Sequence, residues 1–275
     1  MEIFYFSGTG NSLHVARELA LRLSNASLVP IMATSDEKGY KIRDEVIGLV
    51  FPIHALTLPW PVHAFLEMTD FSSTSYIFAL ATRECFARVF DDIDRILQRQ
   101  DKKLDAGFSL EMPQNYIPIF ETYSPAEVER VEGAMLEKLE GIAKTITEGK
   151  PHRPKEPAWS FPLAHGLVPM ISWWYQKVRF PDMERSFYAD DTCTGCGICE
   201  RVCLSSKIQL VGGKPVWDET VQCSYCFACL HFCPGEAVQI RGRKTASKGR
   251  YHHPEIKAGD IALQKIQNNF YGPSS

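Results

Sequence analysis

The first half of the chain alternates short apolar runs with stretches in which apolar residues recur every three or four positions. Runs of the first kind predict buried strands, and stretches of the second kind predict helices with one buried face. We expect strands at 2–6, 28–32, 46–52, 76–82 and 106–112, and helices at 13–23, 61–68, 86–99 and from 125 to about 149. This alternation is typical of a mainly parallel sheet that is covered by helices on both faces, an α/β fold.

The helix expected after residue 124 has recognisable signals at both ends. Ser124 suits the N-cap, Pro125 the first helical position and Glu127 the third, which together form a capping box. Gly149 suits the end of the helix, because glycine readily adopts the left-handed conformation found there. We therefore take residues 1–150 as one domain.

The rest of the chain divides into three segments by composition. Residues 151–188 start as a linker rich in proline and charge and continue as an aromatic stretch, which predicts packing between domains or, alternatively, a surface for a substrate or partner. Residues 189–242 are dense in cysteine and carry hairpin signals. Residues 243–275 form a tail with a basic start, which we expect to lie over the domains as a solvated strap.

Composition and charge exclude several classes of protein. The chain has 275 residues, of which 45% are hydrophobic and 23% charged, and its formal net charge is −3. These values suit a globular protein of about two domains and argue against a strongly basic nucleic-acid-binding protein. The sequence shows no secretory signal and no apolar run of about 18 residues, so we expect no membrane span and a cytoplasmic location.

Eight of the 9 cysteines form a repeated pattern. The spacing C-x₂-C-x₂-C-x₃-C begins at Cys193 and again at Cys223, where it ends in Cys-Pro. This is the bacterial ferredoxin spacing, which holds two 4Fe–4S clusters. A pair of zinc sites is the alternative, because zinc also uses C-x₂-C pairs. Such crowding in a chain without an export signal favours metal over disulfide bonds.

The spacing also predicts how the cysteines are shared. Three thiolates from one loop bind one cluster, and the fourth, on the following helical turn, points to the other cluster. One expected ligand set is Cys193, Cys196, Cys199 and Cys233, and the other is Cys203, Cys223, Cys226 and Cys229.

Residues 7–12 connect the first expected strand to the first helix and are all small or polar. A helix N-terminus offers free N–H groups and the positive end of the helix dipole, both of which favour an anion. A P-loop would need Gly-Lys-Ser/Thr, and a dinucleotide fingerprint would need glycine where Leu13 stands. The loop therefore predicts a site for a single phosphate monoester, with a simple strand–helix turn as the alternative. The candidate residues are Ser7, Gly8, Thr9, Gly10, Asn11 and Ser12.

With these two motifs the chain resembles the flavodoxin–ferredoxin fusion family, two-domain electron carriers typical of anaerobes. The flavodoxin likeness covers residues 1–150 and the ferredoxin likeness about 189–242. The resemblance implies a flavodoxin-like five-stranded parallel sheet in the order 2-1-3-4-5, with FMN at its switch point and its phosphate in the loop at 7–12. It also implies a small α+β ferredoxin domain with two 4Fe–4S clusters.

The same resemblance places the flavin ring among the loops that follow the third, fourth and fifth strands. The residues concerned are Pro52, Ile53, His54 and Ala55; Thr82, Arg83, Glu84, Cys85 and Phe86; and Asn115 and Tyr116. The loop after the fourth strand departs from flavodoxins, which usually carry glycines there. We expect His54 and Arg83 to place positive charge near the ring, where it would stabilise anionic reduced flavin. Cys85 is interpreted as a buried inert thiol, with a reactive thiol as the alternative.

The functional expectation is an electron-transfer protein that passes single electrons between two 4Fe–4S clusters and FMN, with a redox protein as donor or acceptor. The alternative is an FMN-dependent reductase of a small-molecule electron acceptor, such as a quinone, nitro or unsaturated compound, fed by its own ferredoxin domain. No acid–base pair can be identified, so we assign no catalytic residue. A third hypothesis makes the clusters structural or sensory.

Overall fold

The computed structural model describes residues 1–34, 40–83, 88–154 and 166–266, with the side chain of Arg83 left out. Its first unit is a five-stranded sheet in the order β2-β1-β3-β4-β5, with all four pairs parallel. The strands are β1 (Glu2–Tyr5), β2 (Ser27–Pro30), β3 (Val46–Pro52), β4 (Tyr76–Arg83) and β5 (Ala106–Glu111). This strand order is that of the flavodoxin-like fold, as the resemblance to flavodoxin implies.

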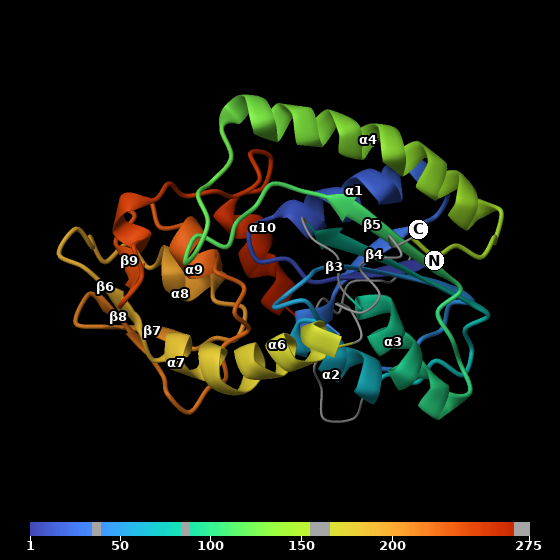
Figure 1. Ribbon diagram of the computed structural model, residues 1–275, viewed down its shortest axis with the longest axis horizontal. Helices are drawn as coiled ribbons and strands as arrows, with labels where there is room; N and C mark the ends of the chain where they lie inside the picture. The colour runs from blue at the N-terminus through green and yellow to red at the C-terminus, as the bar shows by residue number, and fades with distance from the viewer. Residues whose placement is uncertain (35–39, 84–87, 155–165, 267–275) are drawn as a thin grey trace, which may run out of the picture.

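Helices cover both faces of the sheet (Figure 1). Helices α1 (Asn11–Arg22) and α4 (Pro125–Thr147) pack together on one face, and α2 (Trp60–Met68) and α3 (Val89–Leu97) on the other. Short 3₁₀ turns follow β2 and α3, namely η1 (Ile31–Thr34) and η2 (Gln98–Gln100). The capping box of α4 is present: Ser124 N–H donates to Glu127 Oε2 at 2.7 Å, and Gly149 follows the helix with a φ of 61°.

The centre of the sheet is almost inaccessible to solvent. Leu49 of β3 and Leu80 of β4 have no exposed surface, because helices cover them from both sides. Between these strands the ring of Phe78 lies directly over Gly48, where an added Cβ would come within 2.2 Å of the ring. The absence of a side chain at Gly48 is therefore what lets the aromatic ring pack across the central strand pair.

The second unit is built from short elements around the cysteines. They are α6 (Val168–Trp174), the π-helical η4 (Tyr175–Arg179), α7 (Phe180–Glu184), β6 (Phe187–Ala189), α8 (Ile198–Val202), β7 (Ile208–Val211), β8 (Lys214–Trp217), α9 (Ala228–His231) and β9 (Val238–Ile240). Strands β6 and β9 pair antiparallel, as do β7 and β8. Helices α8 and α9 each begin after a residue with positive φ, Gly197 and Phe227, so the repeat in sequence is also a repeat in backbone conformation.

The tail returns to the first unit. It contains η5 (Thr245–Ser247), α10 (Ala258–Ala262) and η6 (Leu263–Lys265), and α10 packs against α8 between the sheet and the cysteine-rich elements (Figure 1). The expectation of a solvated strap holds only in part, because Ile256 and Ile261 are buried in the same core as the sheet. The tail therefore helps to fix the two units to each other.

Residues that precede the aromatic segment extend the sheet. The N–H of His152 donates to Asp105 O at 3.2 Å, and its ring stacks on Phe108 with centroids 4.6 Å apart. The chain after α4 is thus held against the edge strand β5 before it reaches residues 155–165, which lie outside the described ranges. Among the described helices, none has the length and apolar character needed to cross a membrane.

Candidate functional site

A cavity of about 360 Å³ lies at the carboxyl end of the sheet, where the cysteine-rich unit meets it. In doubly wound sheets this end, at the point where the strand order reverses, is where ligands bind. The loops after β1, β3, β4 and β5 form one wall, and the opposite wall carries Ile171, Tyr175, Phe180, Tyr225, Cys226 and Phe227. A wider hollow of about 740 Å³ lies between α7, β6 and β8, and no cysteine lines it.

The loop at 7–12 and the loops after β4 and β5 meet in this cavity. Asn115 Nδ2 donates to Thr9 Oγ1 at 2.6 Å, and the hydroxyls of Ser12 and Thr82 lie 2.8 Å apart. Gly10 is the N-cap of α1, with a φ of 100° and no side-chain cap for the first N–H groups of the helix. Uncapped N–H groups at a helix N-terminus are suited to an anion. The loop at 7–12 thus lines the cavity at an uncapped helix N-terminus, and its binding of a phosphate stays a prediction.

Gln114 is a cavity residue that the sequence analysis missed. Its Oε1 accepts the N–H of Tyr116, whereas its buried Nε2 has no hydrogen-bond partner among the described residues. An unpaired buried donor costs about 1–3 kcal/mol unless a ligand or water accepts from it. Gln114 therefore fits a ligand that offers an oxygen or nitrogen acceptor. In the sequence, nothing distinguishes this glutamine from other loop residues.

The loop after β3 lines the cavity with Pro52, Ile53, His54 and Ala55, and Leu56 continues it. It turns sharply: His54 N–H donates to Thr57 O at 3.1 Å, and Thr57 N–H donates back at 3.0 Å. The two residues between them, Ala55 and Leu56, have φ values of 47° and 66°. For residues with a side chain, this left-handed conformation costs about 1–2 kcal/mol each.

The electrostatics of His54 differ from the expectation. Burial lowers the pKa of His54 to about 4, because the surrounding protein disfavours the charged ring. His54 is therefore neutral at pH 7 and does not supply the positive charge that we expected near a flavin. Of the loop after β4, Thr82 lines the cavity and the backbone of Arg83 ends the strand, whereas Glu84, Cys85 and Phe86 lie outside the described residues.

The eight cysteines of the repeat fall into two groups of four. Cys193, Cys196, Cys199 and Cys233 line one small cavity. The thiol of Cys229 interacts electrostatically with Cys203, Cys226 and Cys223, and more weakly with Cys199 of the first group. Cys233 thus lies beside the three cysteines of the first run, and the crossed sharing of cysteines between two clusters stays a prediction.

The arrangement of the thiols bears on the zinc alternative. Sulfurs around one tetrahedral zinc lie about 3.8 Å apart, given Zn–S bonds of about 2.3 Å. Among the described residues, no three cysteine sulfurs gather closely enough to hold one ion. The described cysteines are thus not arranged as in a zinc site, and the iron–sulfur clusters stay a prediction.

Backbone N–H groups point at the sulfurs. Lys207 N–H lies 3.3 Å from Cys203 Sγ, Tyr225 N–H lies 3.3 Å from Cys223 Sγ, and Ala237 N–H lies 3.2 Å from Cys233 Sγ. Burial raises the pKa of Cys199 to about 11 and also raises the pKa of Cys223, so these thiols stay protonated unless a metal binds them. In iron–sulfur proteins, N–H groups near the cysteine sulfurs help to set the reduction potential of the cluster.

The cavity and the second cysteine group are in direct contact. Cys226 lines the cavity, and Trp60 Nε1 donates to Cys223 O at 2.7 Å.

His231 donates from Nε2 to Asn115 O at 2.8 Å and accepts Tyr251 N–H at 3.0 Å through Nδ1. Burial lowers the pKa of His231 to about 4, so the ring is neutral and its tautomer is fixed by these two bonds. This histidine packs rather than binds a ligand.

Comparisons with known proteins add little to the evidence for the fold. No family model matches the sequence, and none of the curated proteins resembles it. Among solved structures, the chain is similar to rubredoxin oxygen:oxidoreductase (ROO) from the anaerobe Desulfovibrio gigas, with 13% sequence identity and a TM-score of 0.30. The match covers 52% of this chain and 36% of that one. The flavodoxin-like assignment rests on the strand order and register of the sheet.

Proposed function

We propose that this protein is an electron carrier that holds FMN in the cavity and one 4Fe–4S cluster in each cysteine group. The observation that carries the proposal is the shared wall of the two sites, since Cys226 belongs to a cysteine group and also lines the cavity. When bound, the clusters supply one-electron chemistry, and FMN supplies one- or two-electron chemistry. The protein's part is to hold these sites in contact.

The cavity residues divide by role. The loop at 7–12 would hold the phosphate through N–H and hydroxyl groups, since no lysine or arginine stands before Arg17. Gln114 Nε2 would donate to the polar edge of the flavin ring. The flat side chains of Tyr175, Phe180 and Phe227 on the opposite wall would pack against the ring and keep water away.

The two cysteine groups differ in their access to solvent. Cys196 is exposed, whereas Cys199 of the same group is buried, so this outer group reaches the surface. The inner group, which includes Cys226, lies against the cavity. We infer that electrons are exchanged with a redox protein at the outer group and with FMN at the inner group.

The apolar rim of the cavity favours one second candidate. Ile119, Phe120 and Ile171 line the cavity while remaining 47%, 52% and 37% exposed. Such a rim suits a flat apolar electron acceptor, and the protein would then be a reductase of a quinone or nitro compound. Turnover of such a compound with a chemical reductant, without any protein acceptor, would identify the reductase.

Anaerobic purification followed by measurement of iron, sulfide and flavin tests the proposal. We expect about eight irons and one FMN per chain, in line with two 4Fe–4S clusters. With reduced ferredoxin as donor, Cys229→Ser should remove about half of the iron and slow flavin reduction. Zinc in place of iron would contradict the proposed clusters, and eight irons without any flavin binding would contradict the proposed cavity ligand.

A further inference from the structure

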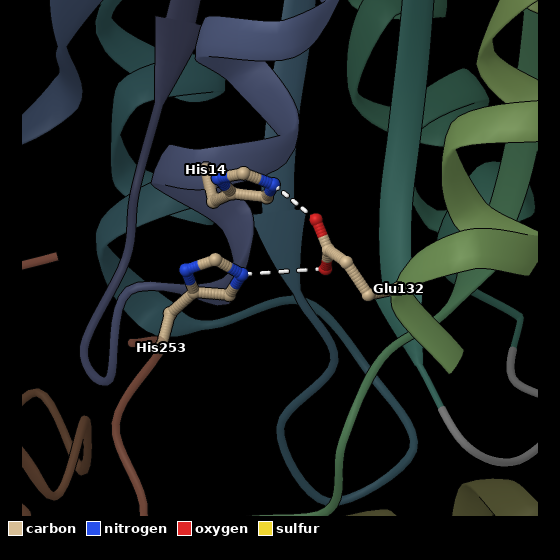
Figure 2. Close-up of side chains that lie close together, drawn as sticks. All are labelled: His14, Glu132 and His253. Atoms are coloured by element: carbon tan, nitrogen blue, oxygen red, sulfur yellow. Dashed lines mark hydrogen bonds and ion pairs between the residues drawn. The ribbon is translucent and has the colours of Figure 1, made fainter. Parts of the chain in front are cut away.

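A second group of polar side chains lies away from the cavity. His14 comes from α1, Glu132 from α4 and His253 from the tail, and Figure 2 shows the two rings facing one carboxylate. One ligand atom from each residue lies within 4.8 Å of the others. We propose that these three residues bind one divalent transition-metal ion, for which Zn²⁺ is the best fit.

The two rings lie side by side and face the same carboxylate. The two imidazole rings stack with centroids 3.8 Å apart and planes at 18°, so both present Nε2 to the same side. His14 Nε2 lies 2.5 Å from Glu132 Oε1, and His253 Nε2 lies 3.3 Å from Glu132 Oε2. Ligand atoms around a tetrahedral zinc, with bonds of 2.0–2.2 Å, lie about 3.3 Å apart. The three side chains therefore need only local adjustment to bring one ligand atom each to the spacing of a zinc site.

Two carboxylates stand beside the ring of His14. Its Nε2 faces Glu132, and its Nδ1 lies 3.3 Å from Oε2 of Glu255, so a carboxylate stands at each ring nitrogen. A neutral ring carries one proton and would turn a lone pair toward one of these carboxylates. An ion at Nε2 removes the conflict, because Nδ1–H then donates to Glu255. A carboxylate that orients a metal-bound histidine in this way is a common feature of metal sites.

The kind of ion follows from the donors. Two imidazoles and one carboxylate suit Zn²⁺ or Fe²⁺, whereas Mg²⁺ and Ca²⁺ prefer oxygen ligands alone. Both histidines are buried, and the Glu132 side chain is 24% exposed, which leaves room for water as a further ligand. One existing contact would be lost, since His253 Nδ1 accepts Glu255 N–H at 3.3 Å and a metal-bound ring carries a proton there.

An ion at this position would fasten the tail to the first unit. The N–H of His253 donates to Thr9 O at 2.8 Å, so the residue that binds the ion also binds the loop at 7–12. None of the three ligands lines the cavity. The site is therefore separate from the proposed flavin and cluster sites. Metal binding here does not depend on whether flavin or clusters bind there.

The test is a titration of the iron-loaded, full-length protein with Zn²⁺, Fe²⁺ or Mn²⁺ against a chromophoric chelator. We expect one Zn²⁺ per chain beyond the iron of the clusters. Glu132→Gln and His253→Ala should weaken binding by at least about tenfold, and Glu255→Gln by about 10–100-fold. His63→Ala is the matched control, because it removes an exposed histidine that pairs with Glu67 on α2 and should leave binding unchanged.

A second measurement uses only the wild-type protein, so its result does not depend on whether a variant folds. Zinc X-ray absorption of the wild-type protein should show nitrogen and oxygen ligands at 2.0–2.2 Å with imidazole scattering. The proposal is overturned if the wild-type protein binds no ion, or if Glu132→Gln and His253→Ala bind it as tightly as His63→Ala. Sulfur ligands at about 2.3 Å without any imidazole scattering would also overturn it, since they would place all the zinc at cysteines.

Discussion

Gly8 lies directly against the backbone of Cys226: a Cβ added at Gly8 would come within 2.1 Å of the Cys226 carbonyl oxygen and 2.7 Å of its Cβ. Gly8 belongs to the loop that closes the cavity, and Cys226 belongs to the inner cysteine group. The two segments can approach this closely only because position 8 carries no side chain. This contact sets the separation between the proposed flavin and the proposed inner cluster.

Gly8→Ala should push these two segments apart. We expect a loss of about 1–3 kcal/mol in the free energy of unfolding, as for other overpacked sites, together with slower flavin reduction by the clusters. Urea denaturation and stopped-flow absorbance would measure the two effects. Gly133→Ala on α4 is the control, because nothing lies within 4 Å of its added Cβ and it should be neutral or stabilising. Equal stability of the two variants would contradict the close contact.

In the turn after β3, replacing a residue with glycine should increase the stability of the protein. Ala55 has a φ of 47°, so Ala55→Gly should raise the free energy of unfolding by up to about 1 kcal/mol. The same substitution at Ala134, which is exposed on α4, should lower it by about 1 kcal/mol. Thermal denaturation of both variants checks the opposite signs. A loss of stability at both positions would mean that the turn is not strained.

Glu184 connects three groups around the inner cysteines. Its carboxylate lies 2.8 Å from Nζ of the buried Lys207 and accepts hydrogen bonds from Cys223 N–H at 2.9 Å and Tyr225 OH at 2.7 Å. Glu184→Gln leaves the Lys207 charge without its counter-charge and should cost about 3 kcal/mol of stability.

Tyr225→Phe is the control for Glu184→Gln, because it removes one hydrogen bond and should cost about 1 kcal/mol. Chemical denaturation of the iron-loaded variants would compare the two losses. If Tyr225→Phe lost as much stability as Glu184→Gln, the ion pair with Lys207 would contribute nothing.

The lowered pKa of His54 predicts part of the pH dependence of stability. The folded-state pKa of about 4 lies below the value of 6.5 for a free histidine, so the unfolded chain takes up the proton first as the pH falls. The contribution of His54 is therefore complete above pH 6.5 and is lost as the pH falls toward 4. Its size is of the order of 3 kcal/mol.

His54→Asn should flatten the loss of stability between pH 6.5 and 4, and urea denaturation across that range would measure the change. His63→Ala provides the comparison, because it removes an exposed histidine and leaves His54 in place. An unchanged slope in His54→Asn would show that the buried environment of His54 does not lower its pKa.

Most of the sheet could be predicted from the sequence because its signals are local. Apolar runs marked all five strands, and Ser124 and Glu127 marked the start of α4. The second strand was predicted too long at its carboxyl end. Its last pair joins Pro30 to Tyr5, and because proline has no N–H to donate, the strand gives way to a 3₁₀ turn at Ile31.

The parts that escaped prediction depend on contacts between distant residues. Gln264 and His253 have the polar character of a solvated tail, yet both are buried against the loop at 7–12. His14 occupies an ordinary position on an amphipathic helix, and only the folded chain brings Glu132 to it. Periodicity reports which face of an element is buried, and it carries no information about which polar groups will meet there.

The loop at 7–12 is held by hydrogen bonds to residues that are synthesised much later. Gln264 Oε1 accepts the N–H of Ser7 at 3.0 Å across 257 positions, and Tyr251 OH donates to Asn11 Oδ1 at 2.8 Å across 240. The loop therefore leaves the ribosome long before its partners exist. A ligand that enters the cavity of a nascent chain can still exchange with the medium, and the loop reaches its final form only when the tail docks on it.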